Sequence, residues 1–169
     1  MGVKGWKEDR HRRGQLPLYQ FFYRLYNSIS PKHIILRYII KKIYILFEFP
    51  YGCEIHPSCV IGPGLYLGHP WNITINGKAI IGSNCNIHKG VTIGQESRGK
   101  RKGAPEIGSS VWIGVNSTIV GKIVIGDDVM IAPNSYVNCD VPSHSIVIGN
   151  PCIIHHRDNA IEEYVNNRI

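Results

Sequence analysis

Aliphatic residues recur every six positions through most of the chain, in three series separated by a two-residue slip and a longer break. This period fits neither a helix nor a plain strand, because a plain strand does not need a glycine or small turn residue after most of its aliphatic positions. Hexapeptide repeats of this kind form a left-handed parallel β-helix, in which stacked triangular coils bury the aliphatic column. The three series are Ile55, Ile61, Leu67 and Ile73; then Ile75, Ile81, Ile87 and Ile93; then Ile107, Ile113, Ile119, Ile125, Ile131 and Val137. The sequence therefore predicts a mainly β protein.

The residue four places after an aliphatic position is often small. In a triangular coil this position points inward near a corner, so a small side chain is expected there. Five residues fit this description, namely Cys59, Ala79, Cys85, Ser117 and Ser135. We expect all five to be buried.

A short helical arm is predicted before the repeats. Residues 16–28 carry apolar side chains at helical spacing, and a second helix is expected after Ser30-Pro31 because serine caps and proline begins helices. Basic residues interrupt this second helix, so it is not expected to span a bilayer. Two interpretations remain open for residues 16–48: packing on the β-helix or a neighbouring subunit, which we favour, or peripheral contact with anionic lipid. Residues 1–14 are polar and basic and are expected to be disordered or loosely attached.

Ile107 follows Ile93 by fourteen positions, where a step of six would keep the repeat. The excess predicts an extended loop over residues 95–105 that leaves the prism. Its basic residues either close over an anionic ligand or form a solvated surface, and both interpretations stay open.

The repeats are expected to end near Val137, because Pro142 and Pro151 interrupt the segment after it. Residues 158–166 predict a short C-terminal helix capped by Asp158. The domain organisation is therefore a basic helical N-terminal arm (1–50), a β-helix domain (51–154) and a C-terminal tail (155–169).

The net charge of the chain is confined to the arm. Residues 1–50 hold ten Lys/Arg and three Asp/Glu, giving +7, and residues 51–169 hold nine of each, giving zero. Neither part has the pattern of a nucleic-acid-binding fold, so we expect no nucleic acid partner.

The five cysteines are odd in number and form no C-x-x-C pair, and no signal peptide is evident. Reduced thiols and a cytoplasmic location are therefore expected.

The histidines carry the candidate chemistry. The coils lack the histidine pair, five residues apart, that zinc-binding β-helices present, so no metal is expected. His69 lies in the irregular string LGHPWNITIN, and Glu54 precedes it by fifteen residues, close to the length of one coil. A carboxylate that orients one ring nitrogen leaves the other free to act as a general base. The alternative is a histidine that merely ends a corner, and no role is predicted for His88.

Several ordered motifs together resemble the serine O-acetyltransferase family of hexapeptide acyltransferases. They are residues 54–57 (EIHP), 62–65 (GPGL), 68–69 (GH), 91–94 (VTIG) and 149–151 (GNP). The resemblance implies an acyltransferase that forms a homotrimer and binds acetyl-CoA as donor between neighbouring prisms, with His69 as catalytic base and Glu54 orienting it. It also implies that a pantetheine channel is lined by Gly94, Gly114, Val115, Ala132 and Pro133. From their charge alone, Lys100, Arg101 and Lys102 are expected to meet the CoA phosphates.

The chain also departs from that family. Gly68 stands where the family has an acid that holds the amino acid, and Gly103-Ala104 replace an Arg-His pair before Pro105. The large helical domain of the family is reduced to the short arm. These differences disfavour L-serine as acceptor. The short basic arm joined to this β-helix resembles the enzymes that O-acetylate sugars in capsular or exopolysaccharide pathways, and that resemblance implies a carbohydrate hydroxyl as acceptor.

A sugar ring would find candidate stacking faces on Tyr66, Trp71 and Trp112. Aromatic residues in coils more often pack at corners or between subunits, and for Trp112 we favour this packing role. A basic arm also suits a substrate carried on lipid at the inner face of the membrane. L-serine O-acetylation in cysteine biosynthesis, a noncatalytic trimeric scaffold and a γ-carbonic-anhydrase-like enzyme are the alternatives.

Overall fold

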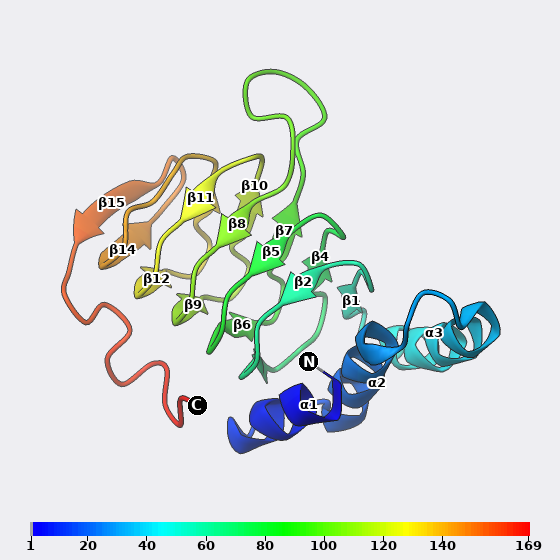
Figure 1. The fold of residues 1–169 in the computed structure, drawn as a ribbon. Helices are drawn as coiled ribbons and strands as arrows, with labels where there is room; N and C mark the ends of the chain where they lie inside the picture. Colours follow the sequence, from blue (N-terminus) through cyan, green and yellow to red (C-terminus); the bar gives the residue numbers. More distant parts are fainter. Residues whose placement is uncertain (1) are drawn as a thin grey trace.

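Three sheets, parallel except at β15, wind into a prism in the computed structural model, which describes residues 2–169 (Figure 1). Sheet A holds β1 (Glu54–Ile55), β4 (Thr74–Ile75), β7 (Thr92–Gly94), β10 (Thr118–Val120) and β13 (Tyr136–Val137). Sheet B holds β2 (Val60–Ile61), β5 (Ile80–Ile81), β8 (Glu106–Ile107) and β11 (Val124–Ile125). Sheet C holds β3 (Tyr66–Gly68), β6 (Asn86–His88), β9 (Val111–Ile113), β12 (Val129–Ile131), β14 (Ser145–Ile148) and β15 (Ile153–His156). The chain visits sheets A, B and C in turn, so the predicted β-helix is confirmed.

The register places the six-residue repeat in the core. Ile75 pairs with Ile55 and Ile93 in sheet A, and Ile87 pairs with Leu67 and Ile113 in sheet C. These side chains are fully buried. The stacked aliphatic column is the main apolar contribution to the fold, since each buried side chain of this size is worth roughly 1.5–3 kcal/mol.

The small residues near the corners are buried as predicted, at Cys59, Ala79, Cys85, Ser117 and Ser135. The hydroxyls of Ser117 and Ser135 both donate to the carbonyl of Ala132, at 2.9 and 2.7 Å. The buried hydroxyls therefore have partners, which limits the cost of placing them in the core.

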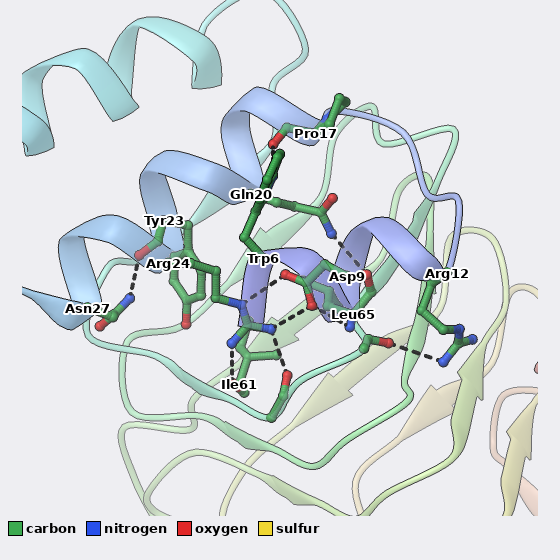
Figure 2. Close-up of polar contacts among 12 residues, drawn as sticks. Trp6, Asp9, Arg12, Pro17, Gln20, Tyr23, Arg24, Asn27, Ile61 and Leu65 are labelled. Carbon is green, nitrogen blue, oxygen red and sulfur yellow. Dashed lines mark hydrogen bonds and ion pairs between the residues drawn. The ribbon is translucent and has the colours of Figure 1, made fainter. Parts of the chain in front are cut away.

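The arm is three helices, α1 (Gly2–His11), α2 (Pro17–Ser28) and α3 (Ile34–Glu48). For residues 2–14 the expectation of a disordered or loosely attached segment is wrong, because α1 packs on α2 and buries an ion pair between Asp9 and Arg24 (Figure 2), while residue 1 lies outside the described residues. The basic pattern of this segment was misleading, since Asp9 and Arg12 are buried rather than solvated.

Side chains of α2 and α3 cover the open backbone edge of the first coil. Tyr23 donates to the carbonyl of Cys59 at 2.6 Å, and Tyr44 donates to the carbonyl of Ile55. The hydroxyl of Tyr19 accepts from the backbone N–H of Ile55 at 2.9 Å. A terminal coil would otherwise present unpaired backbone groups, so the arm is part of the fold.

The N-terminal end of α3 projects away from the prism (Figure 1). The helix exposes large apolar side chains at Ile34, Ile35, Leu36, Tyr38, Ile39, Ile45 and Leu46. None of the helices in residues 2–169 is long and apolar enough to cross a membrane.

The C-terminal part differs from the prediction in two ways. The repeats continue past Val137, because β14 adds to sheet C in parallel and β15 then pairs with β14 in the antiparallel direction. The helix predicted for residues 158–166 is wrong, since this segment forms successive turns. Asp128 accepts from the backbone N–H groups of Ala160 and Ile161, at 3.2 Å each, and so anchors the first of these turns to the prism.

Candidate active site

His69 lies at the corner where sheet C gives way to sheet A, directly after β3. Its backbone has a positive φ of 49°, as does Asn72 at 56°, and its carbonyl accepts from the N–H of Trp71 at 2.7 Å. This bend absorbs the two-residue slip in the repeat. Because the bend leaves the regular coil, the His69 side chain is exposed, as an acid-base group that meets substrate must be.

Gly68 and His88 are neighbours across β3 and β6. A Cβ atom at position 68 would lie 2.5 Å from Nδ1 of His88, so the imidazole occupies the space that a side chain at 68 would need. Burial, followed by the nearby charge of His69, lowers the pKa of His88 below its ordinary value of 6.5. His88 is therefore neutral near pH 7 and lies next to the candidate base.

Glu54 is exposed on β1 and faces the end of α3. Burial raises the pKa of Glu48 on that helix to about 7, and the nearby Glu54 adds to the effect. Within the described chain no ion pair joins Glu54 to His69, so the structure does not bring this predicted pair into contact. The orienting role of Glu54 stays a prediction.

Four of the predicted channel residues stack on the same edge as His69. Gly114 and Val115 follow β9, and Ala132 and Pro133 follow β12, each at the corner between sheets C and A. Successive turns are joined by backbone hydrogen bonds, such as Asn134 N–H to the carbonyl of Val115 at 2.9 Å. A Cβ at Gly114 would lie 2.6 Å from the backbone N of Pro133, so this position requires glycine.

Gly94 and the long loop lie at the other end of sheet A. Gly94 ends β7, and residues 95–105 leave the prism there, as predicted (Figure 1). The loop closes on itself through two backbone hydrogen bonds between Glu96 and Gly103, at 2.9 Å each. Arg101 pairs with Glu96 at 3.2 Å, whereas Lys100 and Lys102 form no ion pair in the part of the chain that is described. Lys100 and Lys102 are thus the better candidates for phosphate contact.

Metal-binding side chains do not gather in groups of three or more anywhere in residues 2–169. The five cysteines are free thiols. At this edge the exposed imidazole of His69 is the group whose geometry suits proton transfer.

Three residues with unusual surroundings were missed by sequence reasoning. Glu48 lies in an apolar helix, where an isolated acid is a usable signal of an unusual environment. His88 occupies an ordinary outward position of a repeat, and its importance depends on the glycine across from it. Arg12 is buried although it stands in a basic, polar segment, so no local pattern distinguishes it.

Comparison with known proteins is consistent with this geometry. Residues 104–139 match the family model described as bacterial transferase hexapeptide (six repeats). The serine acetyltransferase of Helicobacter pylori is 34% identical over 128 residues, which cover 76% of this chain and 74% of that protein.

Solved structures extend the match to the fold. Soybean serine acetyltransferase superposes with a TM-score of 0.74 at 26% identity, over 88% of this chain and 66% of that one. Neisseria gonorrhoeae serine acetyltransferase in complex with serine gives a TM-score of 0.65 at 32% identity, over 82% of this chain and 54% of that one. The chain thus spans about two thirds or less of these solved relatives.

Proposed function

Because the chain belongs to the serine acetyltransferase family of hexapeptide-repeat acyltransferases, we propose that it transfers an acetyl group from acetyl-CoA to a hydroxyl. L-serine is the first candidate for the acceptor. L-serine is supported by the relative from Helicobacter pylori, which matches over about three quarters of both chains. The gonococcal relative, solved with serine, adds to this support. The comparisons thus favour L-serine over the sugar acceptor that the sequence suggested.

The observation that carries the proposal is the shared edge of His69 and the Gly114 and Ala132 turns. A thioester lying along this edge would meet backbone groups rather than bulky side chains, and its carbonyl would reach the exposed imidazole. His69 takes the proton of the acceptor hydroxyl, whose oxygen bonds to the acetyl carbon. The bond from carbon to sulfur then breaks, and the proton passes from His69 to the leaving thiolate.

A sugar hydroxyl is the second candidate acceptor, and the contact between Gly68 and His88 favours it. An acidic side chain at position 68 cannot fit against the His88 ring as packed, so the amino group of serine lacks that partner here. This observation concerns recognition of the acceptor and leaves the acetyl-transfer step unchanged.

A homotrimer belongs to the same proposal. Its support is the large exposed apolar surface of α3, where Ile35 is 78% and Leu46 72% exposed, because such patches mark contact surfaces. Contact with the inner face of a membrane remains the other use of this surface, and a cytoplasmic location is compatible with both uses.

The test is release of free CoA from acetyl-CoA with L-serine, nucleotide sugars and oligosaccharides as acceptors. We expect His69→Ala to lose on the order of 10²–10⁴-fold in rate, the usual contribution of a general base. The matched control is His155→Ala, which removes an exposed histidine from β15. Full activity in His69→Ala contradicts the assignment of the base. If sugars are acetylated and L-serine is not, the acceptor is the second candidate, a sugar hydroxyl.

A further inference from the structure

Arg12, just beyond the end of α1, is a buried cation without an acidic partner. Within the described residues its side chain donates to neutral acceptors only, the carbonyl of Gly64 at 3.1 Å and the amide oxygens of Asn84 at 3.2 Å and of Asn86. Its Nε is buried and has no partner, and across residues 2–169 no carboxylate forms an ion pair with it. Figure 2 shows the guanidinium pointing away from the Asp9 and Arg24 pair. A buried charge of this kind calls for an anion.

A cavity of about 310 Å³ lies beside Arg12, between the end of α1, the outer face of sheet C and the C-terminal segment. We call it the Arg12 pocket. It is lined by Arg12, Arg13, Tyr66, Asn86, His88, Trp112, Tyr164, Asn166 and Asn167. All of these residues lie in the described part of the chain, two of them are cationic and none is acidic. The pocket is therefore suited to an anionic ligand.

Aromatic rings follow one another around the pocket. Their centroids are 6.0 Å apart from Tyr66 to His88, 4.9 Å from His88 to Trp112 and 5.1 Å from Trp112 to Tyr164. Tyr66, a stacking face expected from the sequence, and Trp112, for which the sequence favours packing, both lie here, whereas Trp71 packs edge-on against Tyr51. Rings in this arrangement offer apolar faces to the ring of a ligand.

The C-terminal segment closes the pocket by contacts to two asparagines of the prism. Asn86 donates to the carbonyl of Tyr164 at 2.9 Å, and Asn84 accepts from the N–H of Ile169 at 3.0 Å. This places the amides of Asn166 and Asn167 in the wall. Amide side chains both donate and accept hydrogen bonds, which suits hydroxyl groups.

We propose that the Arg12 pocket binds a sugar phosphate, with the phosphate at Arg12 and Arg13, the ring against Trp112 and Tyr66, and the hydroxyls at the asparagine amides. Guanidinium groups match phosphate geometry, and the amide and aromatic side chains of the lining suit the hydroxyls and the ring of a sugar. A monosaccharide ring with one phosphate fits the volume. The proposal goes beyond acetyl transfer and requires neither acetyl-CoA nor L-serine.

The test is isothermal titration calorimetry of the full chain with the 1-phosphates of glucose, galactose and mannose, and with inorganic phosphate and glucose. We expect at least one hexose 1-phosphate to bind with a Kd below about 1 mM, and both phosphate and glucose to bind at least about 10-fold more weakly. Trp112→Leu and Arg13→Gln should each weaken binding by about 10-fold or more.

The matched controls are Trp71→Leu and Arg10→Gln, which remove an exposed tryptophan and an exposed arginine outside the pocket. These controls should bind like the unaltered chain. Absence of binding for all three sugar phosphates overturns the proposal, as does equal weakening in the controls. Because the readout is binding, it is independent of whether L-serine is acetylated.

Discussion

Two buried arginines of the same helical arm have opposite surroundings. Arg24 donates to both carboxylate oxygens of Asp9 at 2.9 Å, and also to the carbonyls of Ile61 and Gly62 at 2.6 and 2.7 Å (Figure 2). Arg12 has comparable burial, 3% against 2% exposed, and among residues 2–169 it donates to neutral acceptors only. The first arginine joins α1 and α2 to the prism, and the second stands at the edge of a cavity.

The difference distinguishes an arginine that stabilises the fold, Arg24, from one that we propose binds a ligand, Arg12. Burial raises the pKa of Asp9 even beside Arg24, and burial lowers the pKa of Arg12, so removal from water opposes the charge in both places. At Asp9 the cost is offset within the chain by a bidentate pair. At Arg12 hydrogen bonds to neutral acceptors offset part of the cost, and no carboxylate in residues 2–169 forms an ion pair with it. The anion that we propose for the pocket would supply that counter-charge. Substitutions on the two sides should therefore differ in their effects.

The largest effect is expected for Asp9→Asn. It leaves Arg24 buried without a counter-charge and weakens the hydrogen bond from the backbone N–H of Leu65, which Asp9 accepts at 2.9 Å. Breaking one partner of a buried pair typically costs about 3–5 kcal/mol of unfolding free energy. Urea unfolding at fixed protein concentration measures it, with Glu8→Gln on the same helix as control. If Asp9→Asn and Glu8→Gln lowered the unfolding free energy equally, the buried ion pair of Arg24 would not stabilise the fold, and Arg24 would no longer differ from Arg12.

A smaller effect is expected for Arg12→Met, because no carboxylate loses its partner. The loss is that of hydrogen bonds to Gly64, Asn84 and Asn86, roughly 1–3 kcal/mol in the free protein. A hexose 1-phosphate at ten times its Kd should stabilise the unaltered chain by about 1.4 kcal/mol and the variant by none. Urea unfolding with and without ligand gives both numbers. Equal stabilisation of the variant would show that the ligand binds elsewhere.

Much of the fold was predictable because its signal is local and repeated. The aliphatic period predicted the prism, and the break in that period pointed to His69 and to the 95–105 loop. The Asp9 and Arg24 pair joins residues of two helices, so no window of sequence shows it. For the same reason residues 1–14 looked like a solvated segment although α1 lies within them.

The other missed features depend on contacts between distant residues. The turns after residue 157 are set by the carboxylate of Asp128, which accepts the N–H groups of Ala160 and Ile161. The local spacing of apolar residues in 161–165 suggested a helix instead. The position of His88 is informative only because Gly68 lies beside it in the neighbouring coil. Sequence patterns thus found the repeated scaffold and the exposed corner, and could not find the pocket beside it.

The smallest predicted effect concerns His88, which lies in the Arg12 pocket with Arg12 and Arg13, near Tyr66, Tyr164 and His69. Its pKa is lowered in the folded chain, so its contribution to stability is present above the ordinary value of 6.5 and is lost as the pH falls through the folded value. Protonation would add a third cation to a pocket without an acid. His88→Gln should therefore lose less stability than the unaltered chain between about pH 7.5 and pH 5.5.

Urea midpoints at both pH values measure this difference, and His155→Gln is the exposed control. Asp9 has the opposite pH dependence, because its raised pKa favours the folded state at low pH and that contribution is lost as the pH rises. The comparison must therefore be made between variants that keep Asp9. If His88→Gln and the unaltered chain lose the same stability, protonation of His88 is not opposed by the pocket. A bound hexose 1-phosphate should reduce the stability that the unaltered chain loses between about pH 7.5 and pH 5.5. Such a reduction would show that the loss comes from the missing counter-charge, because the phosphate then gives the pocket the negative charge that Asp9 gives to Arg24.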